Sequence, residues 1–250
     1  MIKALLCDLD GTLLNIDFAG FMKDYLEGAA RYFEDCIPPE VFQRQVLVST
    51  GAILANDQPG RTMLQAFMDH FSQALTLPPD TLERFQKYYE TDFPKLERWG
   101  GPVPGARELL EAALERGLDL VIATAPLFPE MPVRERLRWA GVDDLPYRLI
   151  TSSEVMTRSK PFPAYYEEIA ERLGVPPQQC LMVGDETVMD GAAARAGMRV
   201  ALVGSDRPSF TNRMVASTEL ERLFTETGPD LPRYPGLNEL LDRLRAEGVL

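Results

Sequence analysis

The chain has 250 residues, 45% of them hydrophobic and 26% charged, which suffices for one large buried core or two smaller ones. Its net charge of −12 argues against a general nucleic-acid binder, because binding to a phosphate backbone needs a basic face. No stretch approaches the roughly 20 apolar residues of a membrane span, and acidic residues interrupt the first apolar run, so no signal peptide is predicted. Three cysteines without paired spacing fit reduced thiols in a cytoplasmic protein.

The first predicted element is a buried strand over Ala4–Cys7. The segment from Asn15 to about Arg98 then shows only helical patterns, separated by Pro-Pro and Pro-Gly pairs. These patterns lie near Phe18–Phe33, Pro39–Leu47, Arg61–Leu77 and Pro79–Tyr89. We interpret the segment as an all-helical module inserted after the first strand, with a loop and hinge expected over Trp99–Gly105.

Downstream of the insert, apolar runs alternate with helical patterns. The runs are Leu118–Ala123, Tyr147–Ile150 (the weakest), Leu181–Val183 and Arg199–Val203. The helical patterns are Gly105–Arg116, Val133–Ala140, Ala164–Leu173 and Gly191–Ala196. This alternation predicts an α/β fold, a doubly wound parallel sheet with helices on both faces, in which ligands bind at the carboxyl ends of the strands. After Val203 the pattern is vague, with a short helix expected at Ser217–Thr225 and an amphipathic helix at Leu237–Glu247.

The strongest chemical motif is Asp8-Leu9-Asp10-Gly11-Thr12, directly after the first strand. The carboxylates of Asp8 and Asp10 can reach the same position if the chain turns after the strand, and Gly11 permits that turn. Burying two negatively charged carboxylates costs free energy unless a positive charge compensates, and Mg²⁺, which takes oxygen ligands, supplies that charge. The alternative is a surface turn that caps the next segment, but the preceding buried strand favours a site.

Further polar residues follow the other predicted strands. Asp185 and Asp190 come after Leu181–Val183, and the alternative for both is a role at a helix N-terminus. Lys160 precedes a proline in a stiff extended stretch, where the alternative is a solvated loop lysine. Thr124 and the backbone N–H of Ala125 end the second predicted core strand and are suited to donate to phosphate oxygens.

Taken together, these motifs resemble the haloacid-dehalogenase-like superfamily, in particular its phosphatase branch. The matching pieces are Asp8-Leu9-Asp10-Gly11-Thr12-Leu13, Pro104-Gly105-Ala106, Thr124, Lys160-Pro161-Phe162-Pro163, and Gly184-Asp185 with Asp190. The resemblance covers residues 1–14 and about 100–203 well, and the insert only by its position and helical type. It implies a Rossmann-like catalytic core formed by residues 1–14 and 100–250, with residues 15–99 as a helical cap whose opening and closing gate the site.

The resemblance also implies a role for each matching residue. Asp8 would form an aspartyl-phosphate, and Asp10 would act as general acid and then general base. Mg²⁺ would be bound by Asp8, Asp185 and Asp10, the last through its backbone carbonyl. Thr124, Ala125 and Lys160 would hold phosphate, with Lys160 oriented by Asp190. Such positioning and charge stabilisation are what phosphoryl transfer requires.

Some residues depart from the family pattern, and some functions remain as alternatives. Glu186 replaces a small hydroxyl residue and is expected to face solvent, although a metal contact stays open. A carbon–halogen hydrolase is disfavoured by Asp10, and a phosphonatase by the absence of a convincing lysine in the insert, where Lys23 lies on an ordinary amphipathic pattern. A phosphomutase and a non-catalytic binding or regulatory protein remain the alternatives to a phosphatase.

The expected substrate is a small phosphorylated metabolite, such as a sugar phosphate or nucleotide, rather than a nucleic-acid polymer or a membrane. Its identity depends on the insert, whose aromatic residues are expected to form the core of that module rather than line a pocket. Examples are Phe18, Phe21, Tyr25 and Phe67. The sequence leaves the oligomeric state open, and a homo-oligomer is compatible with it.

Overall fold

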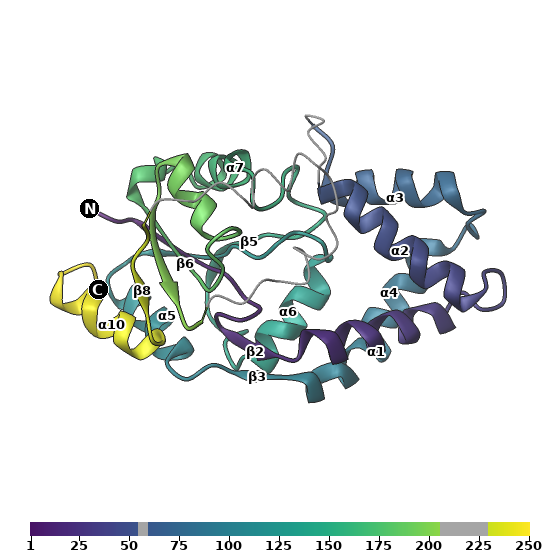
Figure 1. Cartoon of the computed structure of the whole chain (residues 1–250), viewed down its shortest axis with the longest axis horizontal. Helices are drawn as coiled ribbons and strands as arrows, with labels where there is room; N and C mark the ends of the chain where they lie inside the picture. The colour runs from purple at the N-terminus through teal and green to yellow at the C-terminus, as the bar shows by residue number, and fades with distance from the viewer. Residues whose placement is uncertain (55–59, 206–229) are drawn as a thin grey trace.

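The computed structural model describes residues 1–54, 60–205 and 230–250. A central sheet of six parallel strands has the order β5-β4-β1-β6-β7-β8 (Figure 1). Its strands are β1 (Ala4–Cys7), β4 (Asp119–Ile122), β5 (Tyr147–Ile150), β6 (Cys180–Gly184), β7 (Arg199–Val203) and β8 (Arg233–Tyr234). The prediction of a doubly wound parallel sheet is therefore confirmed.

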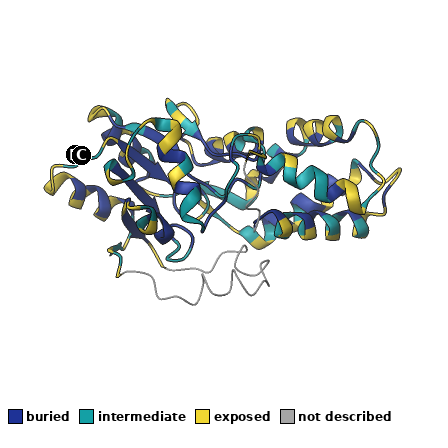
Figure 2. Cartoon of the chain, turned by 90° about the horizontal axis from the view of Figure 1, so that it is seen from above, coloured by how far each residue is buried: buried dark blue, intermediate teal, exposed yellow. Residues whose placement is uncertain are grey.

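Helices cover both faces of this sheet, because alternate residues of each buried strand point to opposite sides. On one side, Leu5 and Cys7 pack in a cluster with α5 (Ala106–Glu115), α6 (Glu130–Trp139) and α10 (Leu237–Ala246). On the other, Ala4 and Leu6 pack with α7 (Pro163–Leu173) and the 3₁₀ helix η3 (Gly191–Ala196). Figure 2 shows that buried residues fill the strands, whereas exposed residues lie on the outer faces of the helices.

The topology brings the ends of three strands together. β1 lies between β4 and β6, and Cys7 at its end is level with Ile122 on one side and Val183 on the other. The strand order therefore reverses at β1, with β4 and β5 on one side and β6 and β7 on the other, and open α/β sheets bind ligands in the crevice at such a point.

A helical insert, residues 17–99, packs beside the carboxyl ends of the strands (Figure 1). Its elements are α1 (Phe18–Arg31), α2 (Pro39–Leu54), α3 (Met63–Ala74), α4 (Thr81–Thr91) and the 3₁₀ helix η1 (Phe93–Trp99). Its interior is rich in aromatic contacts; for example, the rings of Phe33 and Phe42 stack with centroids 4.6 Å apart. The all-helical prediction for this segment is therefore close to the structure.

The structure adds one ribbon that the sequence did not predict. β2 (Leu14–Ile16) pairs antiparallel with β3 (Gly100–Pro102), so that Ile16 lies opposite Gly100. The loop expected from Trp99 onward is therefore partly a strand. Each strand is only three residues long and β3 reads Gly-Gly-Pro, so neither carries an apolar pattern that would predict it.

Other differences are small. Residues Gly191–Ala196 form a 3₁₀ helix rather than an α-helix, a further short 3₁₀ helix η2 covers Pro177–Gln179, and β8 was not predicted. The helix expected at Ser217–Thr225 lies outside the described residues. Among the helices that the structure describes, none is long and apolar enough to cross a membrane. All three cysteines are free thiols.

Candidate active site

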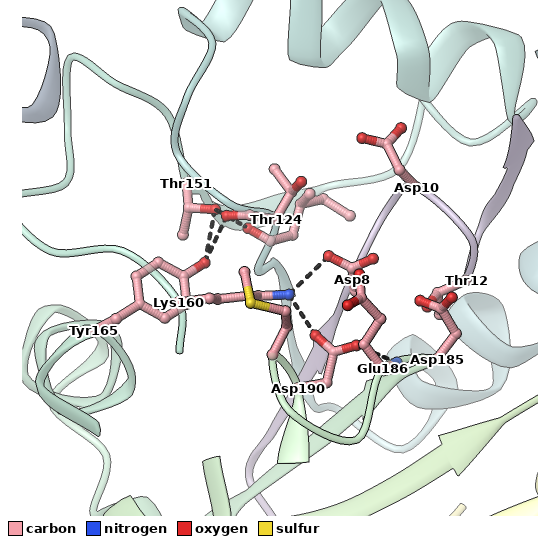
Figure 3. A network of polar contacts seen from close by, with 12 residues as sticks. Asp8, Asp10, Thr12, Thr124, Thr151, Lys160, Tyr165, Asp185, Glu186 and Asp190 are labelled. Atoms are coloured by element: carbon pink, nitrogen blue, oxygen red, sulfur yellow. Dashed lines mark hydrogen bonds and ion pairs between the residues drawn. The ribbon is translucent and has the colours of Figure 1, made fainter. Parts of the chain in front are cut away.

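Asp8 directly follows β1 and lies at the centre of the crevice. Its side chain is buried, and Lys160 Nζ donates to Asp8 Oδ1 over 2.7 Å (Figure 3). The same ammonium donates to Asp190 Oδ1 over 2.5 Å. Lys160 is only 2% exposed, so it is a buried ion-pair partner and not a solvated loop lysine.

Asp190 holds Lys160 in place because its other carboxylate oxygen is also occupied. Asp190 Oδ2 accepts from the backbone N–H of Glu186 over 3.0 Å. The approach of Asp190 to the strand end requires Gly184, since a Cβ there would lie 2.1 Å from Asp190 Cγ. Asp190 is therefore fixed by the turn after β6, and it orients the lysine.

Asp185 completes a group of three buried carboxylates. Ligand oxygens of Asp8, Asp185 and Asp190 lie within 4.8 Å of one another. Thr12 Oγ1 donates to Asp185 Oδ1 over 3.3 Å. Gly11, with φ of +95°, allows this close approach, because a Cβ there would lie 2.5 Å from Asp185 Oδ2.

The electrostatics of this group favour a bound cation. Burial raises the pKa of Asp8 to about 7, although Lys160 opposes the shift. Burial, with the negative charges of Asp8 and Asp190 next, raises the pKa of Asp185 to about 9. Burial would lower the pKa of Lys160, but Asp190 and Asp8 raise it well above its usual range. Lys160 alone thus does not balance the negative charge of the three carboxylates, and a divalent cation with oxygen ligands fits between Asp8 and Asp185.

Asp10 does not belong to the carboxylate group. Its side chain points away from Asp8 and forms an ion pair with Arg136 of α6 (Figure 3 shows its direction). Its expected contribution to the metal through the backbone carbonyl is compatible with this orientation and stays a prediction.

Arg136 is a functional candidate that sequence reasoning missed. Its side chain is 1% exposed, and its guanidinium lies 4.7 Å from the ring centroid of Phe128. Among the described residues, Asp10 Oδ1 and Arg136 Nη2 are both buried without a hydrogen-bond partner. A small rotation to a two-pronged contact would satisfy both atoms. The sequence contained a signal, because Arg136 falls on the apolar face of its helix between Val133 and Ala140.

Thr124 and Ala125 follow β4 at the same edge. The backbone carbonyl of Thr124 accepts from Tyr165 Oη over 2.7 Å and from Thr151 Oγ1 over 2.8 Å. These buried bonds fix the loop in which the expected phosphate donors lie (Figure 3).

All eight residues expected from the sequence line one cavity of about 480 Å³, which we call the acidic cavity. They are Asp8, Asp10, Gly11, Thr124, Ala125, Lys160, Asp185 and Asp190. Glu186 is half-buried at its edge rather than fully solvent-facing, and it is not one of the clustered carboxylates. The structure thus brings the expected residues together, while their chemical roles stay predictions.

Comparison with known proteins gives a family match and a curated relative. A family model described as haloacid dehalogenase-like hydrolase matches residues 2–198. A phosphoglycolate phosphatase of Rhodospirillum rubrum is 30% identical over 209 residues, covering 81% of this chain and 80% of the relative.

Among solved structures, a HAD phosphatase from Thermococcus onnurineus has a TM-score of 0.59 at 20% identity, covering 97% of this chain and 98% of the other. An L-2-haloacid dehalogenase has a TM-score of 0.56 at 19% identity, covering 98% of this chain and 100% of the other. Because one fold carries both activities, these two likenesses identify the architecture but not the reaction.

Proposed function

The chain belongs to the haloacid dehalogenase-like hydrolases and is a phosphatase of that family, and we propose that it hydrolyses a small phosphate monoester through an aspartyl-phosphate on Asp8. The observation that carries the proposed mechanism is the position of Asp8 at the end of β1. There Lys160 binds one of its carboxylate oxygens and the carboxylate of Asp185 lies close to it. The three free thiols, of which Cys36 is exposed, agree with a cytoplasmic location, which we also propose.

In the proposed reaction, an oxygen of Asp8 attacks phosphorus and the bond from phosphorus to the alcohol oxygen breaks. Lys160 engages Oδ1 and, within the described residues, no donor lies on Oδ2. Asp10 gives its proton to the departing alkoxide, and then accepts a proton from the water that attacks the aspartyl-phosphate. Inorganic phosphate leaves and Asp8 is regenerated.

The charge of the acidic cavity supports Mg²⁺ as cofactor. Among the described residues that line it, five are acidic and only Lys160 and Arg136 are basic. Such a cavity would repel a phosphate dianion without an added cation. Asp190 already accepts on both oxygens, so Asp8 and Asp185 are the carboxylates that would bind the metal. The ion would neutralise charge on the phosphate oxygens.

We expect Mg²⁺-dependent release of phosphate from p-nitrophenyl phosphate, with activity falling at least about 100-fold in EDTA. Mg²⁺ should also raise the melting temperature of the wild type, because it binds only the folded state. This rise should be lost in Asp185→Asn and retained in Asp119→Asn, whose carboxylate lies at the start of β4, away from the site. Full activity in EDTA would contradict the metal role. Absence of phosphate release in every condition would favour the phosphomutase alternative, because a mutase transfers the phosphoryl group within its own substrate instead of to water.

For the Asp10–Arg136 pair, we expect the effect of a substitution to depend on the leaving group of the ester. Asp10→Asn should lower kcat/KM for an alkyl phosphate by roughly 100-fold or more, because kcat/KM reports the first step, in which the alkoxide must be protonated as it leaves. The loss of kcat/KM should be much smaller for p-nitrophenyl phosphate, whose phenolate leaves without a proton, although kcat falls for both esters because Asp10 also activates the water of the second step.

Arg136→Met should show the same dependence on the leaving group, because Arg136 touches Asp10 rather than the reacting atoms. Combining it with Asp10→Asn should add little to the loss caused by Asp10→Asn alone. Arg136→Lys should recover part of the activity. Equal losses for both esters would instead assign Arg136 a purely structural role.

A further inference from the structure

A second cavity, of about 260 Å³, lies between the helical insert and the loops that follow β4 and β5. We call it the insert cavity. Its lining includes Met22 and Tyr25 of α1, Phe67 and Met68 of α3, and Phe85 of α4. Phe18, Tyr25 and Phe67 therefore line a cavity, contrary to the expectation that such residues fill the core of the insert, whereas Phe21 is fully buried in that core.

The insert cavity adjoins the acidic cavity. Phe18, Leu127 and Phe128 line both, so the two spaces meet at these three side chains. These three side chains separate the two spaces, so the alcohol portion of a phosphate ester bound at Asp8 would have to pass them to enter the insert cavity.

The charge of the insert cavity excludes an anionic occupant. No basic side chain is present among the described residues that line it. Within that described lining, the only charged side chain is that of Glu154, which accepts from the backbone N–H of Glu130 over 2.8 Å. A carboxylate or second phosphate placed here would lose its hydration without gaining a counter-charge.

The polar side chains of the lining are also largely engaged. Tyr25 Oη and Tyr89 Oη bond to each other over 3.1 Å, and Thr50 Oγ1 donates to the carbonyl of Val46 over 2.8 Å. Gln86 Nε2 donates to Glu90 over 2.7 Å. Among the described lining, Ser153 Oγ is the one side-chain polar atom that is fully buried without a partner. A sugar with several hydroxyl groups would leave most of them unpaired.

We propose that the leaving group of the substrate is an uncharged, mainly apolar alcohol, alkyl or aryl, that occupies the insert cavity. This inference rests on the proposed function for the phosphate end. An apolar cavity of about 150 Å³ accommodates benzene, so 260 Å³ has room for a chain or ring system of about ten carbon atoms. The substrate class is therefore an apolar phosphate monoester, in place of the sugar phosphate or nucleotide expected from the sequence.

The test measures binding of n-alkyl phosphonates, which are not hydrolysed, to the full chain with Mg²⁺ by titration calorimetry. The Kd should fall by about three- to fourfold for each added methylene up to about ten carbons, and then level off. A Kd that does not change with chain length would overturn the proposal. So would tighter binding of 3-phosphonopropionate than of the butyl compound.

Variants assign the effect to the insert cavity. Met68→Glu should weaken binding of the decyl phosphonate at least about tenfold and leave the ethyl compound unchanged. Val48→Glu, at an exposed position of α2 outside the cavity, is the matched control and should change neither. If Met68→Glu does not fold, Met131→Glu places the same charge at a 40% exposed position of the lining. Equal effects of the cavity and control variants would contradict the assignment.

Turnover separates this inference from the proposed function. Hydrolysis of n-hexyl phosphate and of glycerol 3-phosphate is measured in parallel, and hexyl phosphate should have the higher kcat/KM. If neither these esters nor p-nitrophenyl phosphate is hydrolysed, the proposed function fails, while the phosphonate titrations still decide what the insert cavity binds.

Discussion

Asp8→Asn is expected to reduce kcat by roughly 10⁴-fold or more, since the amide cannot form the phosphorylated intermediate. The substitution keeps the shape of the side chain, and Lys160 retains its second partner, Asp190. It also removes one of three crowded carboxylates. The folded state should therefore not be destabilised greatly, and the loss of activity should be chemical in origin. Phosphate release and the melting temperature, measured on the same preparation, separate the two effects.

The intermediate itself provides a direct measurement. Wild-type protein quenched in acid during the first turnover should contain a peptide with Asp8 that is heavier by the mass of one phosphoryl group. The same peptide from Asp8→Asn should be unmodified. Asp119→Asn, which changes an acid at the far end of β4, should behave as wild type. Residual turnover of more than a few per cent in Asp8→Asn would rule out Asp8 as the nucleophile.

Lys160→Met is expected to reduce both activity and stability. It removes the ammonium that Asp8 and Asp190 share, and leaves two buried acids without a positively charged partner among the described residues. Breaking a buried ion pair in this way costs about 3–5 kcal/mol of unfolding free energy. Loss of charge stabilisation on the phosphate should lower kcat by about 100- to 1,000-fold. Denaturant unfolding and phosphate release measure the two effects.

A double variant separates them. The double variant Lys160→Met with Asp190→Asn also removes one of the two unpaired carboxylates. Compared with Lys160→Met alone, it should therefore regain part of the lost unfolding free energy but none of the lost activity. Lys95→Met is the matched control, because Lys95 pairs with Asp92 at 69% side-chain exposure. It should change stability by less than about 1 kcal/mol. If the double variant regained activity as well, the role of Lys160 would be structural.

The sequence predicted the parts of the site that depend on local pattern. Asp8 and Asp185 each follow a short buried run, and a parallel sheet brings such strand ends together. The burial of Lys160 did not follow from its neighbours, because it depends on carboxylates 152 and 30 residues away in the chain. The resemblance to a family supplied the role that the local pattern left open.

What the sequence did not predict depends on contacts across the fold. Arg136 meets Asp10 from 126 residues away, and a single arginine on an apolar helix face does not identify its partner. The β2–β3 ribbon has too few residues for a periodic signal. Of the aromatic residues of α1, Phe21 packs against Phe93 and Trp139, whereas Phe18 and Tyr25 line the insert cavity, a tertiary division that their spacing alone does not give.

The β2–β3 ribbon has a consequence for how this enzyme diversifies. Ile16 and Gly100 are neighbours in the ribbon, so the chain leaves the sheet domain and returns to it at nearly one point. The 83 residues between them therefore form one long connection between two core strands, and the β2–β3 pairing holds its two ends together. Exposed connections with adjacent ends are where whole segments are exchanged most readily. Residues 17–99 can therefore be exchanged as a unit, in evolution or by design, for a segment that recognises a different alcohol. The residues proposed to bind phosphate lie outside this segment and would be kept.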